Sequence, residues 1–126
     1  MQGNNLFEYA VIRVMPKVER EEFFNVGVIL SCPAQNFLSA RIYLNEAKLK
    51  ALAPEFTAET VNRYLKTFST ICAGEETGVI GQLTKRERFY WLTAVRSTIL
   101  QTSPIHTGFC ADAGEMLEHL FEKMVL

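Results

Sequence analysis

The fold is decided by residues 23–44, which read FFNVGVILSCPAQNFLSARIYL. Two runs rich in Val, Ile, Leu and Phe flank a short link, Pro33 to Asn36, and so short a link predicts an antiparallel hairpin. Side chains alternate between the two faces of a strand. One face of residues 23–32 is therefore expected to carry Phe24, Val26, Val28 and Leu30, and the other Asn25 and Gly27. In residues 37–44 the apolar face is expected to carry Leu38, Ala40, Ile42 and Leu44, and the other Ser39, Arg41 and Tyr43.

The Tyr-, Val- and Ile-rich sequence of residues 6–15 predicts a further strand, which ends at Pro16. This run is apolar on both faces except for Glu8 and Arg13, which is typical of a central strand or of one covered on both sides. After residue 44 the apolar spacing becomes helical. Polar residues able to cap a helix precede each of four such segments, and a glycine, Gly74, is placed to end the second. The expected N-caps are Asn45, Thr57, Thr84 and Asp112.

The later part of the chain adds one more predicted strand. Residues 96–101 are β-branched enough to form it, whereas residues 103–110 are interrupted by Pro104 and Gly108 and are predicted to be a loop. We therefore expect one α+β domain over residues 1–126. Its antiparallel sheet should have about four strands, an N-terminal three-stranded meander plus the later strand, with helices packed mainly on one face.

The composition excludes several classes of protein. Thirteen Lys and Arg against fourteen Asp and Glu give a net charge of −1, which argues against a general nucleic-acid binder. No run of apolar residues is long enough to span a membrane, and the N-terminus does not read as a secretory signal. The three cysteines are far apart and form no metal-ligand pair, so we expect reduced thiols in a cytoplasmic protein, with no metal and no cofactor.

Several polar residues could together hold an anion. Strand parity lets Arg13, Asn25 and Arg41 share one face of the sheet. Arginine, hydroxyl groups and a glycine-containing loop are suited to a phosphate or nucleotide. The candidate ligand-binding set is Arg13, Asn25, Arg41, Arg96, Ser103, His106 and Thr107. The alternative is structural: these arginines pair with carbonyl groups or with Glu8, Glu19 or Glu22 and hold loops in place.

Catalysis has weaker support from the sequence. Cys110 follows His106 by four residues, and Ser97 or Ser103 could approach the same imidazole, but such a pair needs an orienting third group. The nearby acid, Asp112, has a competing use as an N-cap, so no catalytic residue is assigned. Basic residues at 85, 86 and 88 precede the aromatic run at 89–91 and are predicted to form a solvated helical turn rather than a nucleic-acid patch.

Two segments together resemble a known family. The first combines EYAVIRV at residues 8–14 with Glu19, Arg20 and NVGV at residues 25–28. The second runs from RFYWLTA at residues 88–94 through Arg96, Ser97, Thr98 and Gln101 to SPIHTG at residues 103–108. Over nearly its whole length the chain resembles the bacterial domain of unknown function 3037 family.

This resemblance implies a small bacterial protein with no established activity. It also implies a neighbour, because members of the family are often encoded beside a HipA-like kinase. From it we expect a cytoplasmic interaction or regulatory partner of such a kinase rather than an enzyme. The alternative left open is a protein that binds, or hydrolyses, a small phosphorylated ligand through the Arg/His set. Association of two copies is also left open.

Overall fold

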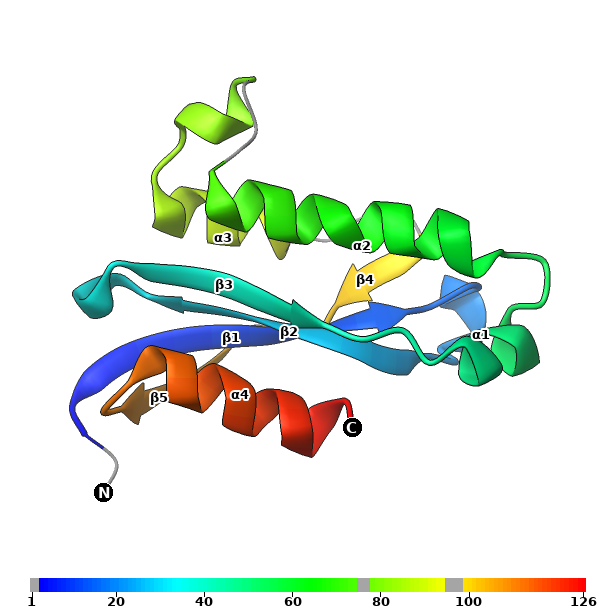
Figure 1. Cartoon of the computed structure of the whole chain (residues 1–126), viewed down its shortest axis with the longest axis horizontal. Helices are drawn as coiled ribbons and strands as arrows, with labels where there is room; N and C mark the ends of the chain where they lie inside the picture. The colour runs from blue at the N-terminus through cyan, green and yellow to red at the C-terminus, as the bar shows by residue number, and fades with distance from the viewer. Residues whose placement is uncertain (1–2, 75–77, 95–98) are drawn as a thin grey trace.

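The computed structural model describes residues 3–74, 78–94 and 99–126, and in them one antiparallel sheet lies between two layers of helix (Figure 1). This confirms the predicted α+β class. The strands are β1 (Asn5–Val14), β2 (Phe24–Cys32), β3 (Phe37–Ile42), β4 (Leu100–Thr102) and β5 (His106–Cys110). The α-helices are α1 (Glu46–Leu52), α2 (Ala58–Ala73), α3 (Lys85–Leu92) and α4 (Ala113–Met124). Short 3-10 turns cover Val18–Arg20, Pro33–Gln35 and Ile80–Gln82.

Each α-helix begins where a polar side chain satisfies a backbone N–H group that the helix cannot pair itself. The side chains of Asn45, Thr57 and Asp112 each accept a hydrogen bond from the backbone three residues on, and Thr84 forms a complete capping box with Glu87. Helix α2 ends at Gly74, whose φ of 76° lies in the left-handed region that glycine adopts without strain. The predicted caps are confirmed.

The sheet has the order β3-β2-β1, and two short strands share the outer edge of β1. Strand β4 pairs with Ile12–Val14, and β5 pairs with Asn5–Tyr9. The prediction of a loop over residues 103–110 is therefore wrong, because residues 106–110 form β5. The later strand is shorter than predicted: it comprises Leu100–Thr102, and residues 96–98 of the expected span lie outside the described part of the chain.

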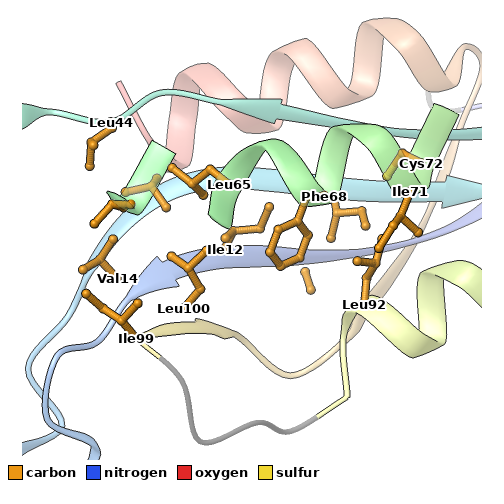
Figure 2. Close-up of a cluster of buried hydrophobic side chains, with 14 of the residues drawn as sticks. Ile12, Val14, Leu44, Leu65, Phe68, Ile71, Cys72, Leu92, Ile99 and Leu100 are labelled. Atoms are coloured by element: carbon orange, nitrogen blue, oxygen red, sulfur yellow. The ribbon is translucent and has the colours of Figure 1, made fainter. Parts of the chain in front are cut away.

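Helices cover both faces of the sheet and create two separate cores. Helices α1, α2 and α3 lie on one face, as predicted, whereas α4 packs against β2 and β3 on the other (Figure 1). Figure 2 shows part of the first cluster, the α2-side core, whose buried members include Ile12, Val14, Leu44, Leu65, Phe68, Ile71, Cys72, Leu92, Ile99 and Leu100. The second cluster, the α4-side core, includes Phe7, Val28, Leu30, Cys32, Cys110, Leu117, Leu120 and Phe121.

A β-bulge in β2 decides which side chains enter which core. Ile12 pairs with Gly27 and Arg13 pairs with Asn25, so Val26 has no partner of its own on β1. Val26 belongs to the α2-side core, whereas Val28 and Leu30 belong to the α4-side core. The prediction that Val26 shares a face with Val28 and Leu30 is therefore wrong, because the extra residue of the bulge reverses the alternation.

No α-helix within residues 3–74, 78–94 and 99–126 is long and apolar enough to cross a membrane.

Candidate functional site

The residues predicted to bind an anion are divided between the two faces of the sheet. Arg13, Asn25, Arg41 and His106 lie on the face that α4 covers in part, as the strand register and their contacts with that side require. Thr107 lies on the opposite face, because it pairs directly with Glu8. Arg96 lies outside the described residues. The predicted set therefore does not form one cluster, although part of it is brought together.

Arg41 is engaged in docking the terminal helix. Its Nε lies 2.7 Å from the Oε1 atom of Glu118 on α4. Its guanidinium also lies 4.8 Å from the centre of the Phe121 ring, a cation–π contact. The predicted alternative, in which an arginine of the set is held by an intramolecular carboxylate, thus applies to Arg41. The carboxylate belongs to α4 rather than to Glu8, Glu19 or Glu22.

Arg13 and Asn25 are the part of the predicted set that the sheet brings together. They are partners across β1 and β2, beside the bulge. The Asn25 amide donates to the Met124 carbonyl at 2.9 Å, and the Arg13 guanidinium lies 4.2 Å from the centre of the Phe23 ring. The Nε of Arg13 and the Oδ1 of Asn25 are buried and have no hydrogen-bond partner. This pair therefore contains one unused donor and one unused acceptor.

Ser103 makes three hydrogen bonds within the fold. Its side chain is buried, and its Oγ accepts a hydrogen bond of 2.8 Å from the backbone N–H of Val11. Its own backbone N–H donates to the Val11 carbonyl at 2.8 Å. The hydroxyl then donates to the Pro104 carbonyl at 2.9 Å. Ser103 thus continues the pairing of β1 across the interval between β4 and β5.

Replacing Ser103 by alanine is expected to lower the free energy of unfolding by about 1–3 kcal/mol. The reason is that the buried N–H group of Val11 loses its acceptor and regains none from water. Thermal and urea unfolding measure the effect, and Thr107→Ala, at an exposed position of β5, is the matched control expected to change stability by less than about 0.5 kcal/mol. Equal stability of Ser103→Ala and the natural chain would contradict this role.

The hypothetical Cys–His pair does not form. His106 and Cys110 occupy opposite ends of β5, about 13 Å apart at the rise of a strand. The His106 ring packs against Tyr9 with centroids 5.2 Å apart, and the Asp112 carboxylate caps α4 by accepting from Glu115 N at 2.8 Å. Ser97 lies outside the described residues. Asp112, the acid that could have oriented a nucleophilic pair, is therefore used as a helix cap instead.

Cys32, Cys72 and Cys110 are free thiols, but all three are buried, and burial makes them poorly suited to nucleophilic chemistry. Burial raises the pKa of Cys72 from 9.0 to about 12, although the charge of Arg88 acts in the opposite direction. Burial also raises the pKa of Cys110, and Cys32 and Asp112 act in the same direction. The reactive thiolate form is thus disfavoured at both positions.

Alkaline pH is expected to destabilise the fold through Cys72. Above pH 9 the thiol ionises in the unfolded chain but stays protonated in the folded one up to about pH 12. The folded state then binds more protons, so stability falls as pH rises, by up to about 1.4 kcal/mol per pH unit from this group. Urea unfolding at pH 8 and pH 10 measures the loss. The loss of stability between pH 8 and pH 10 should be smaller in Cys72→Ala than in the natural chain. Equal losses in these two proteins would show that Cys72 is not its cause.

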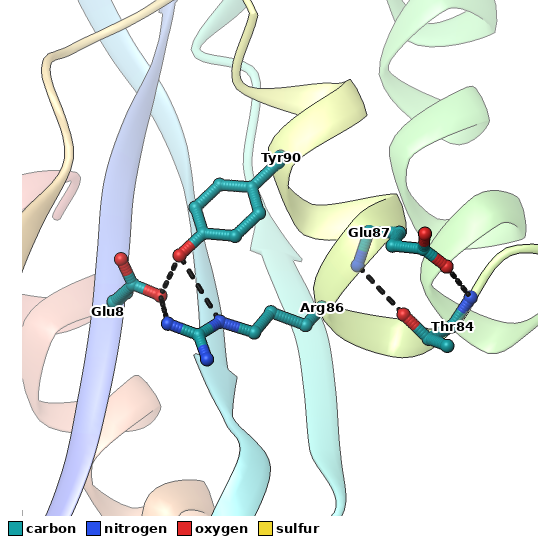
Figure 3. A network of polar contacts seen from close by, with 5 residues as sticks. All are labelled: Glu8, Thr84, Arg86, Glu87 and Tyr90. Carbon is teal, nitrogen blue, oxygen red and sulfur yellow. Dashed lines mark hydrogen bonds and ion pairs between the residues drawn. The ribbon is translucent and has the colours of Figure 1, made fainter.

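A polar network that was not predicted from the sequence lies on the face of the sheet that α3 covers (Figure 3). The Tyr90 hydroxyl donates to Glu8 Oε1 at 2.7 Å and accepts from Arg86 Nε at 3.2 Å. Arg86 Nη2 lies 3.7 Å from the same carboxylate oxygen. The hydrogen bond with Tyr90 is the main cause of a raised pKa of Arg86, and the charge of Glu8 adds to it.

Two features of the sequence could have indicated this network. Arg86 and Tyr90 are four residues apart on one helix, a spacing that brings side chains together. Glu8 interrupts an otherwise apolar run of a strand expected to be covered on both sides, so its carboxylate needed a partner. The partners of Glu8 come from α3 because of the way this helix crosses the sheet. Spacing within a short stretch of sequence does not reveal that crossing.

Exposed side chains on β1, β5 and α3 lie on the same side of the sheet as this network, and we call them the β5 patch. Leu6 and Phe109 face each other across β1 and β5 and are 48% and 55% exposed. The next pair on the same face is Glu8 with Thr107, and Glu8 binds the side chains of α3. The β5 patch consists of Leu6, Arg86, Tyr90, Thr107 and Phe109.

Gly108 allows close packing within the sheet. A Cβ atom there would lie 2.8 Å from Cζ of the Phe7 ring, so the absence of a side chain is what lets Phe7 pack on β5. The glycine-containing loop expected to suit an anion is thus part of a strand at Gly108, which pairs with Phe7. Two open hollows, of about 220 and 420 Å³, lie around α1, and both are lined by Pro54; neither is lined by a residue of the predicted set.

The sequence model of the family described as "Protein of unknown function (DUF3037)" matches residues 9–125. The chain belongs to the DUF3037 family. The DUF3037 match takes in the buried residues of the α2-side core, and it takes in those of the α4-side core except Phe7. It covers the β5 patch except Leu6, because it begins one residue after Glu8. No curated protein and no solved structure matches the chain.

Proposed function

We propose that this DUF3037 protein is a non-enzymatic interaction protein and that its β5 patch binds another protein. The observation that carries the proposal is the pair Leu6 and Phe109, both about half exposed at the margin of the sheet. Beside them stand Arg86 and Tyr90, of two residue types that often dominate the binding energy of protein interfaces. The division of the predicted anion set between two faces, and the unformed Cys–His pair, favour binding over catalysis.

The proposed partner is a HipA-like kinase. The support for this choice is the resemblance drawn from the sequence, which implies that family members are often encoded beside such a kinase. On the same ground we assign the protein to the bacterial cytoplasm. The protein would then act by modulating the kinase, or as one half of a two-gene unit.

Co-expression with the neighbouring kinase, followed by a pull-down, tests the proposal. We expect a complex with the natural chain and a loss of about tenfold or more in affinity for Phe109→Asp, because a carboxylate would have to be buried in an apolar contact. Tyr64→Asp is the matched control, since Tyr64 is 48% exposed on α2, away from the patch. Absence of a complex, together with unchanged kinase activity, would overturn the proposal.

A second candidate function is binding of a small anion at Arg13 and Asn25. It is favoured by the buried Nε donor of Arg13, which has no hydrogen-bond partner. An anion that accepts from this Nε would raise the melting temperature by binding only the folded state. Thermal shift with inorganic phosphate and with nucleotides tests this, and Arg13→Met should abolish any shift. The contribution of Arg96 to such a site stays a prediction.

A further inference from the structure

The outer edge of β5 offers backbone groups for pairing. Within the described part of the chain, β1 is the strand that pairs with β5. Natural proteins usually protect such an edge with lysine, proline or a bulge. Residues 106–110 read HTGFC and contain neither lysine nor proline, and their pairing with β1 is regular. The opposite edge of the sheet, β3, differs because α2 and α4 pack against it and it carries the charged Arg41.

Side-chain alternation gives the two faces of β5 different properties. On the α4 side, Gly108 is covered by the Phe7 ring and Cys110 is buried in the core. On the α3 side, Thr107 and Phe109 are exposed, and Leu6 stands beside Phe109. A strand added to β5 would therefore place every second side chain over the β5 patch.

The β5 patch is positively charged, because Arg86 is more exposed than Glu8, with which it forms an ion pair. The side chain of Glu8 is 14% exposed and that of Arg86 is 57% exposed, so the surface presents the cation. The distance of 3.7 Å from Arg86 Nη2 to the Glu8 carboxylate is longer than a hydrogen bond. Arg86 thus has donors left for a carboxylate that comes from outside.

We propose that the partner contributes an extended segment that pairs with the outer edge of β5. An apolar side chain of this segment covers Leu6 and Phe109, and an acidic side chain two positions away meets Arg86. This recognition mode, in which main-chain hydrogen bonds give affinity and alternate side chains give specificity, is known as strand addition. The inference rests on the proposed function, since it states what the β5 patch binds.

Short synthetic peptides test this mode on the full-length chain. The probe alternates valine and threonine and carries one glutamate on the valine face, and its analogue carries lysine in place of the glutamate. We expect the lysine analogue to bind about tenfold more weakly, and Arg86→Gln to remove this difference. N-methylation of the peptide amides along one edge should abolish binding, whereas methylation along the other edge should leave it nearly unchanged.

Amide hydrogen exchange gives a second readout. Alternate amides of β5, those that point away from β1, should become protected when the glutamate peptide binds, which a contact between side chains alone would not produce. Equal binding of the acidic and basic peptides, or equal effects of methylation on both edges, would overturn the inference. So would a dimer of the chain alone that Phe109→Asp dissociates, because a second copy would then occupy the edge.

The two proposals can fail separately. A kinase complex that Phe109→Asp disrupts, combined with no binding of any peptide, overturns strand addition and leaves the proposed function standing. Selective peptide binding without a kinase complex supports strand addition and removes the kinase as the partner.

Discussion

Replacing Gly27 by valine is expected to destabilise the protein by about 3 kcal/mol or more, a large part of the roughly 5–15 kcal/mol by which an ordinary domain is stable. A Cβ atom at this position would lie 2.7 Å from the carbonyl oxygen of Arg41, which belongs to the neighbouring strand. It would also lie 3.3 Å from Ile12 and 3.4 Å from Ile42. The obstacle is backbone, so the contact cannot be relieved by turning a side chain.

The bulge explains why a glycine is needed there. Gly27 pairs with Ile12, whose side chain is in the α2-side core, and the preceding Val26 is in the same core. Two consecutive residues of β2 thus face one side, and there is room for one side chain. Circular dichroism and urea unfolding measure the effect, and Gly27→Ala provides a milder variant should the valine chain not fold.

Gly114→Ala is the control for this prediction. Its Cβ atom would lie 3.4 Å from Asp112 Oδ2 and 3.9 Å from Phe37, which is ordinary contact, and it lies within α4. Alanine there should stabilise the helix by about 0.5–1 kcal/mol. Equal stability of Gly27→Val and Gly114→Ala would show that the close contact with Arg41 has been misjudged.

Replacing Phe89 by alanine is expected to cost about 3–5 kcal/mol, the usual range for removing a buried aromatic ring. Phe89 is fully buried and is among the largest side chains excluded from water. It lies in α3 and belongs to the α2-side core, so its loss would leave a cavity between that helix and the sheet. Thermal and urea unfolding measure the loss, and Phe89→Leu should recover part of it.

Tyr90→Phe separates the packing of α3 from its polar contacts. The ring is kept, but the hydrogen bonds with Glu8 and Arg86 are lost. We expect a cost of about 0.5–1.5 kcal/mol, well below that of Phe89→Ala. A larger cost for Tyr90→Phe than for Phe89→Ala would mean that the polar network, rather than the buried ring, holds α3 to the sheet.

Local chemistry explains what could be predicted from the sequence. Caps such as Thr84 with Glu87 act within one turn, so their spacing alone identified where the helices begin. The first three strands are rich in β-branched and aromatic residues and have clear turn residues between them, so their existence could be predicted even where the assignment of faces in β2 was wrong. The prediction that Arg13 and Asn25 share a face also agrees with the register, which pairs them directly.

Long-range pairing explains what the sequence analysis missed. Strand β5 contains a glycine and follows a proline, and it is a strand because Phe7 and Tyr9 pair with it from the other end of the chain. The bulge at Val26 becomes visible only when β2 is aligned with β1. Arg41 was matched with the wrong acids because Glu118 approaches from α4, on the face where fewer helices were expected.

The bulge at Val26 also has a consequence for how sequence changes act on this chain. Val26 and Gly27 are consecutive and both face the α2 side. Odd-numbered residues of β2 therefore face the α4 side before the bulge and the α2 side after it. Deleting Val26 would leave Asn25 next to Gly27, so that Arg13 and Ile12 keep their present partners and Phe24 and Asn25 keep their sides. Deleting one residue elsewhere in β2 would instead move the residues on one side of the deletion to the opposite faces of the sheet. This strand should therefore tolerate the loss of a residue better at Val26 than at any of its paired positions.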